Sequence, residues 1–274
     1  MKDNNRIEAN VFDLFITNRC TMNCKMCCAY VPHVKNAHHS DKDVVFREMK
    51  GFFEVFDYAN RIEILGGEPL MHPDLLAIVK EATKYKEQFG DIRITTNCTI
   101  VPGDELLAYI KNCGVLFDFV LDDYGEISRH CRQVQDKIKE YNIPFRVDRY
   151  YGDEQEQYYS GWIDFGNNKC KNYSDDELLN VFNNCTAAKK NSFYATYDGQ
   201  VHQCLYSLAG QYTGRLEPKP GEWIDLFDET LTREQKRSIA SSFLKRPYNA
   251  CRHCNGFLSE TAKRFPAAIQ APKD

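Results

Sequence analysis

Short apolar segments alternate with longer amphipathic ones along the first half of the chain. Of all the features of the sequence, this alternation restricts the possible folds most. Five segments rich in branched and aromatic residues predict buried parallel strands, at 11–17, 61–67, 92–97, 117–124 and 145–151. Helical patterns lie between them at 42–59, 73–88, 104–112 and 128–141, with Pro73 and Pro102 where helix starts tolerate proline. Alternating strands and helices predict an α/β fold with a parallel sheet. We expect a partial (β/α)6 parallel barrel over residues 1–165.

The rhythm changes after about residue 152, where the sequence becomes polar, acidic and rich in tyrosine. An alternating segment around Asp198-Gly199 predicts a β-hairpin. A helix is expected near 231–245, before a tail that contains Cys251-Arg-His-Cys254. We therefore expect residues 166–274 to form a small C-terminal α+β domain.

Composition excludes several kinds of partner. The 35 basic and 39 acidic residues give a net charge of -4, which offers no broad basic surface to nucleic acid. No apolar run approaches the roughly 18 residues of a membrane span, and the amino terminus lacks the apolar region of a signal peptide. A cytoplasmic location is expected. The 12 cysteines are then better explained as metal ligands or reactive groups than as disulfides.

Three of these cysteines follow the first predicted strand closely, as Cys20-x-x-x-Cys24-x-x-Cys27. Functional groups of parallel barrels gather on loops at the carboxyl ends of strands. Three thiolates on one such loop can hold three irons of a cubane and leave the fourth iron without a protein ligand. The alternative is a zinc site that includes Cys28, but two of its ligands would then be adjacent residues, unlike the separated pairs of structural zinc sites.

The second predicted strand ends in Gly66-Gly67-Glu68-Pro69. Two glycines let a ligand approach the backbone closely, and a carboxylate can accept hydrogen bonds from an ammonium group. Together with the cysteine triad, this segment resembles the radical S-adenosylmethionine (SAM) enzymes over roughly residues 10–150. The resemblance implies a 4Fe-4S cluster whose open iron is chelated by the amino and carboxylate groups of SAM. The implied cluster ligands are Cys20, Cys24 and Cys27, and the implied contacts to the methionyl group are Gly66, Gly67 and Glu68.

The ends of the third and fourth strands carry weaker signals. Thr96, Asn97 and Asp122 occupy places where members of this family contact cofactor or substrate, but such residues are also ordinary turn formers. The residue before the third cysteine is usually aromatic in the family. Met26 stands there in this chain and can still pack against an adenine ring.

A second set of four cysteines resembles the truncated SPASM, or twitch, extension of radical SAM enzymes over roughly residues 180–260. The resemblance implies an auxiliary 4Fe-4S cluster held by Cys185, Cys204, Cys251 and Cys254. No cysteine follows Cys254, so one auxiliary cluster is expected. Four protein thiolates leave no iron for a substrate, which favours electron transfer. Zinc bound by the same four thiols is an alternative.

The resemblance implies reductive cleavage of SAM to a 5'-deoxyadenosyl radical, which takes a hydrogen atom from a substrate. A flavodoxin- or ferredoxin-type protein would supply the electron. We expect a small polar substrate, a sugar or sugar nucleotide, that is either oxidised or epimerised. Oxidation needs a base and a second electron acceptor, and epimerisation needs a hydrogen donor such as a cysteine thiol. The catalytic candidates are Arg149, Asp122 and Cys98.

Further substrate contacts are expected from the loop after the cluster and from the domain junction. Arg149 is the first choice, because a guanidinium suits a phosphate or carboxylate. Two rival functions remain open: a maturase of a ribosomal peptide, disfavoured because about ten residues precede the first strand, and a non-catalytic metal-binding scaffold, disfavoured by the intact cysteine triad and Glu68. The other candidate contacts are Tyr30, His33, His38, His39, Trp162 and Asp164.

Overall fold

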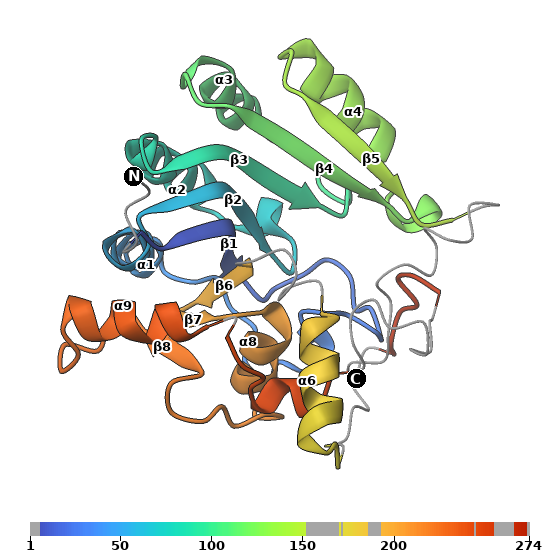
Figure 1. Cartoon of the computed structure of the whole chain (residues 1–274). Helices are drawn as coiled ribbons and strands as arrows, with labels where there is room; N and C mark the ends of the chain where they lie inside the picture. Colours follow the sequence, from blue (N-terminus) through green and yellow to red (C-terminus); the bar gives the residue numbers. More distant parts are fainter. Residues whose placement is uncertain are drawn as a thin grey trace.

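A computed structural model of the chain describes residues 6–151, 170, 172–185, 193–243, 245–254 and 266–272. Its strands form one sheet in the order β5-β4-β3-β2-β1-β6-β7-β8 (Figure 1). The first six strands in sequence are mutually parallel, whereas β7 and β8 run antiparallel to their neighbours. The sheet is open, which confirms the expected partial barrel. The strands are β1 (Glu8–Thr17), β2 (Tyr58–Gly66), β3 (Phe89–Thr96), β4 (Phe117–Asp123), β5 (Phe145–Arg149), β6 (Phe193–Tyr197), β7 (Gln200–His202) and β8 (Trp223–Asp225).

Helices connect the parallel strands where the sequence predicts them. They are α1 (Lys42–Val55), α2 (Leu75–Ala82), α3 (Asp104–Asn112) and α4 (Cys131–Glu140). The Asp41 carboxylate caps α1 by accepting a hydrogen bond from the Asp43 amide, as expected of an N-cap aspartate. Two predicted helices were too long at their ends, because β2 already begins at Tyr58 and a 3-10 turn follows α2. Among the described residues, no helix is long and apolar enough to cross a membrane.

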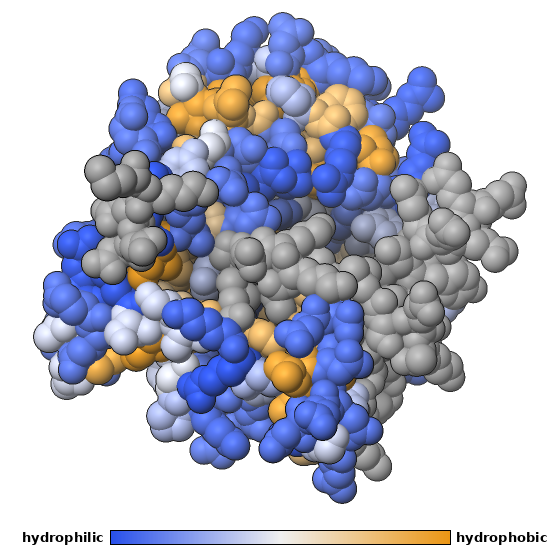
Figure 2. All heavy atoms as spheres, viewed as in Figure 1, coloured by the Kyte–Doolittle hydropathy of each residue, from blue (hydrophilic) through white to orange (hydrophobic). Residues whose placement is uncertain are grey.

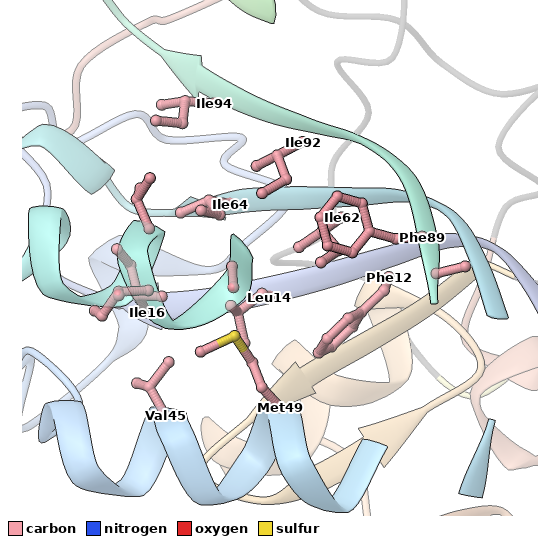
Figure 3. Packing of buried hydrophobic residues seen from close by; sticks show 14 of the residues in the cluster. Phe12, Leu14, Ile16, Val45, Met49, Ile62, Ile64, Phe89, Ile92 and Ile94 are labelled. Carbon is pink, nitrogen blue, oxygen red and sulfur yellow. The ribbon is translucent and has the colours of Figure 1, made fainter. Parts of the chain in front are cut away.

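Only one face of the sheet packs against these helices. Alternate residues of β1 to β4, such as Phe12, Leu14 and Ile62, lie in one core with apolar residues of α1 to α4. Figure 3 shows Val45 and Met49 of α1 pointing toward β1 from below. The strands were predicted as buried, but residues on their other face are largely charged and partly exposed. The sheet therefore has an apolar side and a polar side.

The C-terminal half extends the same sheet. β6 pairs with β1, and a tight turn leads from β6 into β7. Asp198 and Gly199 have φ angles of 49° and 82°, the left-handed pair that a type I′ hairpin requires, so the predicted hairpin is confirmed. Figure 1 shows the later helices gathered beyond this hairpin. They are α6 (Asp175–Asn183), α8 (Leu205–Tyr212) and α9 (Arg233–Ser242), the last confirming the helix expected near 231–245. The proposed boundary at residue 165 falls outside the described residues.

Candidate functional site

The loop that carries the cysteine triad is fastened to the loop that follows β2. The Gly67 amide donates to the Thr17 carbonyl at 2.9 Å, and the Glu68 amide donates to the Arg19 carbonyl at 2.9 Å. A Cβ atom on Gly67 would lie 2.2 Å from the Arg19 carbonyl oxygen and 2.9 Å from the Cβ of Cys20. Only glycine allows the two loops to approach this closely.

The three thiols of the triad are neighbours in a site largely removed from water. Burial raises the pKa of Cys20 to about 12, and the charges of Glu68, Cys27 and Cys24 add to this rise. Burial likewise raises the pKa of Cys24 to about 12 and that of Cys27 in the same direction. A positively charged iron would offset this cost by favouring the thiolates.

Amide donors surround the sulfur atoms of Cys20 and Cys24. The Met22 amide donates to Cys20 Sγ at 3.4 Å, and the Asn97 side chain donates to the same atom at 3.5 Å. Gln270 Nε2 donates to Cys24 Sγ at 3.3 Å. Such donors are common around cluster thiolates, so the triad fits an iron-sulfur cluster. Within the described part of the chain, no three Cys, His, Asp or Glu side chains are arranged to hold a single metal ion.

Glu68 links the ends of β2 and β3. Its buried carboxylate accepts hydrogen bonds from the Leu70 amide at 3.0 Å, the Thr96 hydroxyl at 2.8 Å and the Asn97 amide at 2.8 Å. Burial raises the pKa of Glu68 to about 7, while these donors act in the opposite direction. The carboxylate predicted to receive an ammonium group is thus already held by the chain's own donors. Through these hydrogen bonds Glu68 holds the predicted residues Thr96 and Asn97 beside the cluster loop.

Asp122 lies at the end of β4 on the same side as this group. The Tyr124 hydroxyl donates to its carboxylate at 3.3 Å. Burial raises the pKa of Asp122 to about 7, and the negative charges of Asp148 and Glu68 contribute. Asp122 is therefore close enough to Glu68 to interact electrostatically, as the predicted site requires.

The other two predicted catalytic residues, Arg149 and Cys98, lie in different surroundings. Arg149 is exposed and pairs in register with Asp123, whereas Asp122 pairs with Asp148, so strand alternation places Arg149 on the opposite face. Cys98 is fully buried in the core, where a hydrogen bond with the Cys131 thiol and burial raise its pKa, and the charges of Glu68 and Asp122 add to this rise. Arg149 therefore lies away from Asp122, whereas the Cys98 thiol is buried but within electrostatic reach of both Glu68 and Asp122.

The histidines of the loop after the cluster hold that loop in place. His38 Nε2 lies 3.0 Å from the Tyr197 hydroxyl and 3.5 Å from Asp198 Oδ2. His39 Nδ1 lies 2.9 Å from the hydroxyl of Thr17 at the end of β1. These contacts attach the loop to β1 and to the β6–β7 hairpin.

The aromatic end of this loop packs toward the C-terminal half. Tyr30 is buried against Tyr206, and Arg215 lies over the Tyr30 ring at 5.5 Å. The His33 ring lies 6.2 Å from that of Tyr30. Tyr30 thus joins the two halves of the chain. The remaining candidates, Trp162 and Asp164, lie outside the described residues.

Sequence reasoning missed the segment 266–272. It lies beside the cysteine triad: the Lys25 amide donates to the Ile269 carbonyl at 2.7 Å, and the Ala271 amide donates to the Asn23 carbonyl at 2.7 Å. Gln270 Oε1 also accepts from the Asn23 amide at 2.7 Å. No motif or periodicity in this tail signals such a contact, because the pairing depends on tertiary structure.

The second set of cysteines also comes together. Cys204 caps α8, since its sulfur accepts a hydrogen bond from the Ser207 amide at 3.4 Å. Burial raises the pKa of Cys204 to about 12, and Cys185 and Cys254 raise it further through their charges. Burial also raises the pKa of Cys251, with contributions from the other three thiols. All four cysteines predicted for the auxiliary site are therefore within electrostatic reach of one another.

Residues 14–148 match the family model of the Radical SAM superfamily. The chain belongs to this superfamily. The match includes the cysteine triad, the Gly66-Gly67-Glu68 segment and the ends of β3 and β4. Membership implies a 4Fe-4S cluster and SAM, and it makes the chain a radical SAM enzyme.

Curated relatives match a limited part of this radical SAM chain. A protein of Methanococcus aeolicus named "Probable GTP 3',8-cyclase" is 33% identical over 103 residues, which are 35% of this chain and 32% of the relative. The GTP 3',8-cyclase of Campylobacter lari is 27% identical over 113 residues, or 39% of this chain and 34% of the relative. The chain thus aligns with about a third of the length of these relatives.

Solved structures are similar over most of the chain. The structure of BtrN in complex with AdoMet and 2-DOIA has a TM-score of 0.61 and 16% identity, and the match covers 94% of this chain and 97% of BtrN. Native anSMEcpe with bound AdoMet has a TM-score of 0.53 and 12% identity, covering 87% of this chain and 83% of that protein. At these identities, the likeness establishes the radical SAM fold alone.

Proposed function

We propose that this radical SAM enzyme abstracts a hydrogen atom from a small polar, carbohydrate-type substrate and so leads to its oxidation or epimerisation. The observation that carries the proposal is the joined pair of loops: the cysteine triad after β1 and the Gly66-Gly67-Glu68 segment after β2. When bound, the cluster and SAM supply an electron and a 5'-deoxyadenosyl radical. A flavodoxin- or ferredoxin-type protein is the proposed electron donor.

The chain's own residues would hold the cofactors in one place. Cys20, Cys24 and Cys27 are the proposed iron ligands, and the backbone at Gly66 and Gly67 lies against their loop. Glu68 fixes the spacing between β2 and β3 through its three hydrogen bonds. Asn97 donates to Cys20 Sγ and so orients this ligand. Such rigid support keeps reacting atoms aligned, which is a large part of enzymatic rate enhancement.

Asp122 is the proposed base for the oxidative reaction. Its pKa of about 7 allows the carboxylate to hold or release a proton near neutral pH. Its place at the carboxyl end of β4 puts it at the mouth of the partial barrel. Its Tyr124 partner would fix the carboxylate orientation.

An auxiliary 4Fe-4S cluster is proposed at Cys185, Cys204, Cys251 and Cys254. The closeness of the four thiols supports a shared site, and four thiolates match the ligand set of such a cluster. Oxidation of the substrate would deliver its second electron there. Zinc is the competing occupant, and metal analysis separates the two. About eight irons per anaerobically reconstituted chain support two clusters, whereas about four irons and one zinc contradict the auxiliary cluster.

The primary test is 5'-deoxyadenosine release from SAM under dithionite, without any added substrate. The wild-type enzyme should release it, and Cys24→Ala should lower the rate to background because one iron loses its ligand. Cys113→Ala is the matched control, since Cys113 lies beside α3 and outside both proposed ligand sets. Equal release by Cys24→Ala and the wild type would contradict the proposed ligand. In a second assay with a candidate substrate added, a product mass two daltons lower indicates oxidation, and one deuterium gained from heavy water indicates epimerisation.

A further inference from the structure

The side of the sheet opposite α1 to α4 is strongly charged. Each of its three arginines is already bound to an aspartate. The side chains of these arginines and aspartates are 11–55% exposed, in contrast to the apolar core on the other side. Figure 2 shows mainly hydrophilic residues on the described surface in its view. The pairs are Arg61–Asp91 at 2.5 Å, Arg93–Asp118 at 2.5 Å and Arg146–Asp148 at 3.0 Å.

Two acids on this side, in adjacent strands, stand directly opposite each other. Asp13 of β1 pairs in register with Glu63 of β2, an arrangement that destabilises a sheet when both are charged. Glu63 is in turn opposite Arg93, but that guanidinium makes two hydrogen bonds to Asp118, at 2.9 and 2.5 Å. Within the described residues, neither Asp13 nor Glu63 forms an ion pair, and Glu63 Oε1 accepts one hydrogen bond, from the Thr95 hydroxyl at 2.7 Å.

Asp13 has an unmet hydrogen-bonding requirement. It is 1% exposed, and its Oδ1 atom accepts no hydrogen bond from any described residue. Its neighbours Phe12 and Leu14 belong to the helix-covered core, so Asp13 projects to the charged side. A buried carboxyl oxygen without a donor is costly, and a bound donor would remove this cost.

We propose that the charged side of the sheet binds the substrate through an ammonium group, which the Asp13–Glu63 pair receives. The inference rests on the proposed function. An ammonium brings three donors and a positive charge, so it can pair with the partly exposed Glu63 carboxylate and offset the charge that Glu63 places beside the buried Asp13. Glu63 is three residues before the end of β2, about 10 Å from the cluster loop. A substrate anchored there can extend toward the radical.

This assignment changes the expected substrate class. A sugar nucleotide carries a diphosphate, which would meet the acids Asp13 and Glu63 on this side, where the arginines are already paired with aspartates. An amino sugar or a lysine side chain supplies the required cation. The substrate's amine is thus the recognised group, and its source is either a carbohydrate or a peptide.

Binding of matched probes to the cluster- and SAM-loaded enzyme tests the inference. Glucosamine is compared with N-acetylglucosamine, and lysine amide with its Nε-acetyl form, by anaerobic calorimetry. At least one amine should bind tenfold or more tightly than its acetylated partner, and the stronger amine identifies the source. Glu63→Gln should remove this preference, whereas Glu87→Gln, an exposed acid before β3, should retain it.

Three results overturn the inference: the wild type prefers neither amine, the preference survives in Glu63→Gln, or Glu63→Gln changes only the affinity for SAM. Asp13→Asn is a second variant, which preserves side-chain volume and should weaken amine binding similarly. Release of 5'-deoxyadenosine without substrate is measured on the same samples. If the wild type shows no amine preference but releases 5'-deoxyadenosine normally, only the inference is refuted, whereas absent release in the wild type refutes the proposed function.

Discussion

Among single residues, Gln270 has the most direct contact with a proposed cluster ligand from a distant part of the chain. Its amide donates to Cys24 Sγ, and hydrogen bonds to the sulfur atoms raise the reduction potential of a cluster by stabilising the reduced, more negative state. Gln270→Leu should therefore make the potential of the first cluster more negative, with iron content retained. A redox titration followed by electron paramagnetic resonance measures the shift.

Gln135→Leu is the matched control for this prediction. Gln135 donates to the sulfur of Cys131 at 3.3 Å, so the variant removes the same kind of bond from a cysteine outside the ligand sets. Its cluster potential should equal that of the wild type. An unchanged potential in Gln270→Leu would show that the contact to Cys24 has no influence on the cluster.

The sequence allowed the ligands to be predicted because Cys20, Cys24 and Cys27 share one loop, where spacing carries the information. Gln270 could not be predicted, since 246 residues separate it from Cys24. Arg149 was assigned to the substrate from its residue type alone. Neighbouring residues of a strand project to opposite faces, so the sequence Arg-Val-Asp-Arg already indicates that Arg149 and Asp148 lie on different faces of the sheet.

At the level of elements, five strands and four helices follow from apolar periodicity. The difference between the two faces of the sheet follows only from the alternation of single residues along each strand. Residues 61–64 and 91–94 alternate charged and apolar side chains, the pattern of a sheet with one covered face. The pairing of β6 with β1 had no local signal, because a strand's neighbour is set by long-range packing. The hairpin that follows was predictable from Asp198-Gly199.

The β6–β7 hairpin leads directly to Cys204, so its turn should matter for the second cysteine set. Gly199 has a φ of 82°, and a Cβ there would lie 2.4 Å from the Phe227 ring. Gly199→Ala should cost about 1–2 kcal/mol for the left-handed backbone alone, with a further cost from the ring contact. Urea unfolding measures the free energy, and iron analysis reports whether the auxiliary site still loads.

Gly214→Ala separates the two contributions. Gly214 has a similar φ of 68°, but nothing lies within 4 Å of a Cβ at this position. It should therefore show only the backbone cost. Equal losses of stability in the two variants would mean that Phe227 does not restrict the turn.

For the whole molecule, α1 carries a buried acid that makes stability depend on pH. The Glu48 carboxyl is fully buried, and neither oxygen accepts a hydrogen bond from a described residue. Burial raises its pKa from 4.5 to about 8, and the negative charge of Asp198 adds to this rise. Asp198 belongs to the turn after β6, so Glu48 lies where α1 meets the C-terminal half of the sheet.

Between pH 5 and 8, the unfolded chain has released the Glu48 proton, whereas the folded protein retains it. The contribution of Glu48 to the free energy of unfolding should therefore be greatest below pH 4.5. It should fall by about 1.4 kcal/mol per pH unit until the carboxyl of the folded protein ionises near pH 8. Glu48→Gln carries no titrating proton, so its free energy of unfolding should decline less steeply across this range. Urea unfolding at pH 6 and pH 8 measures both slopes, with the exposed Glu87→Gln as the control. Identical slopes in Glu48→Gln and the wild type would show that Glu48 titrates alike in the folded and unfolded chains.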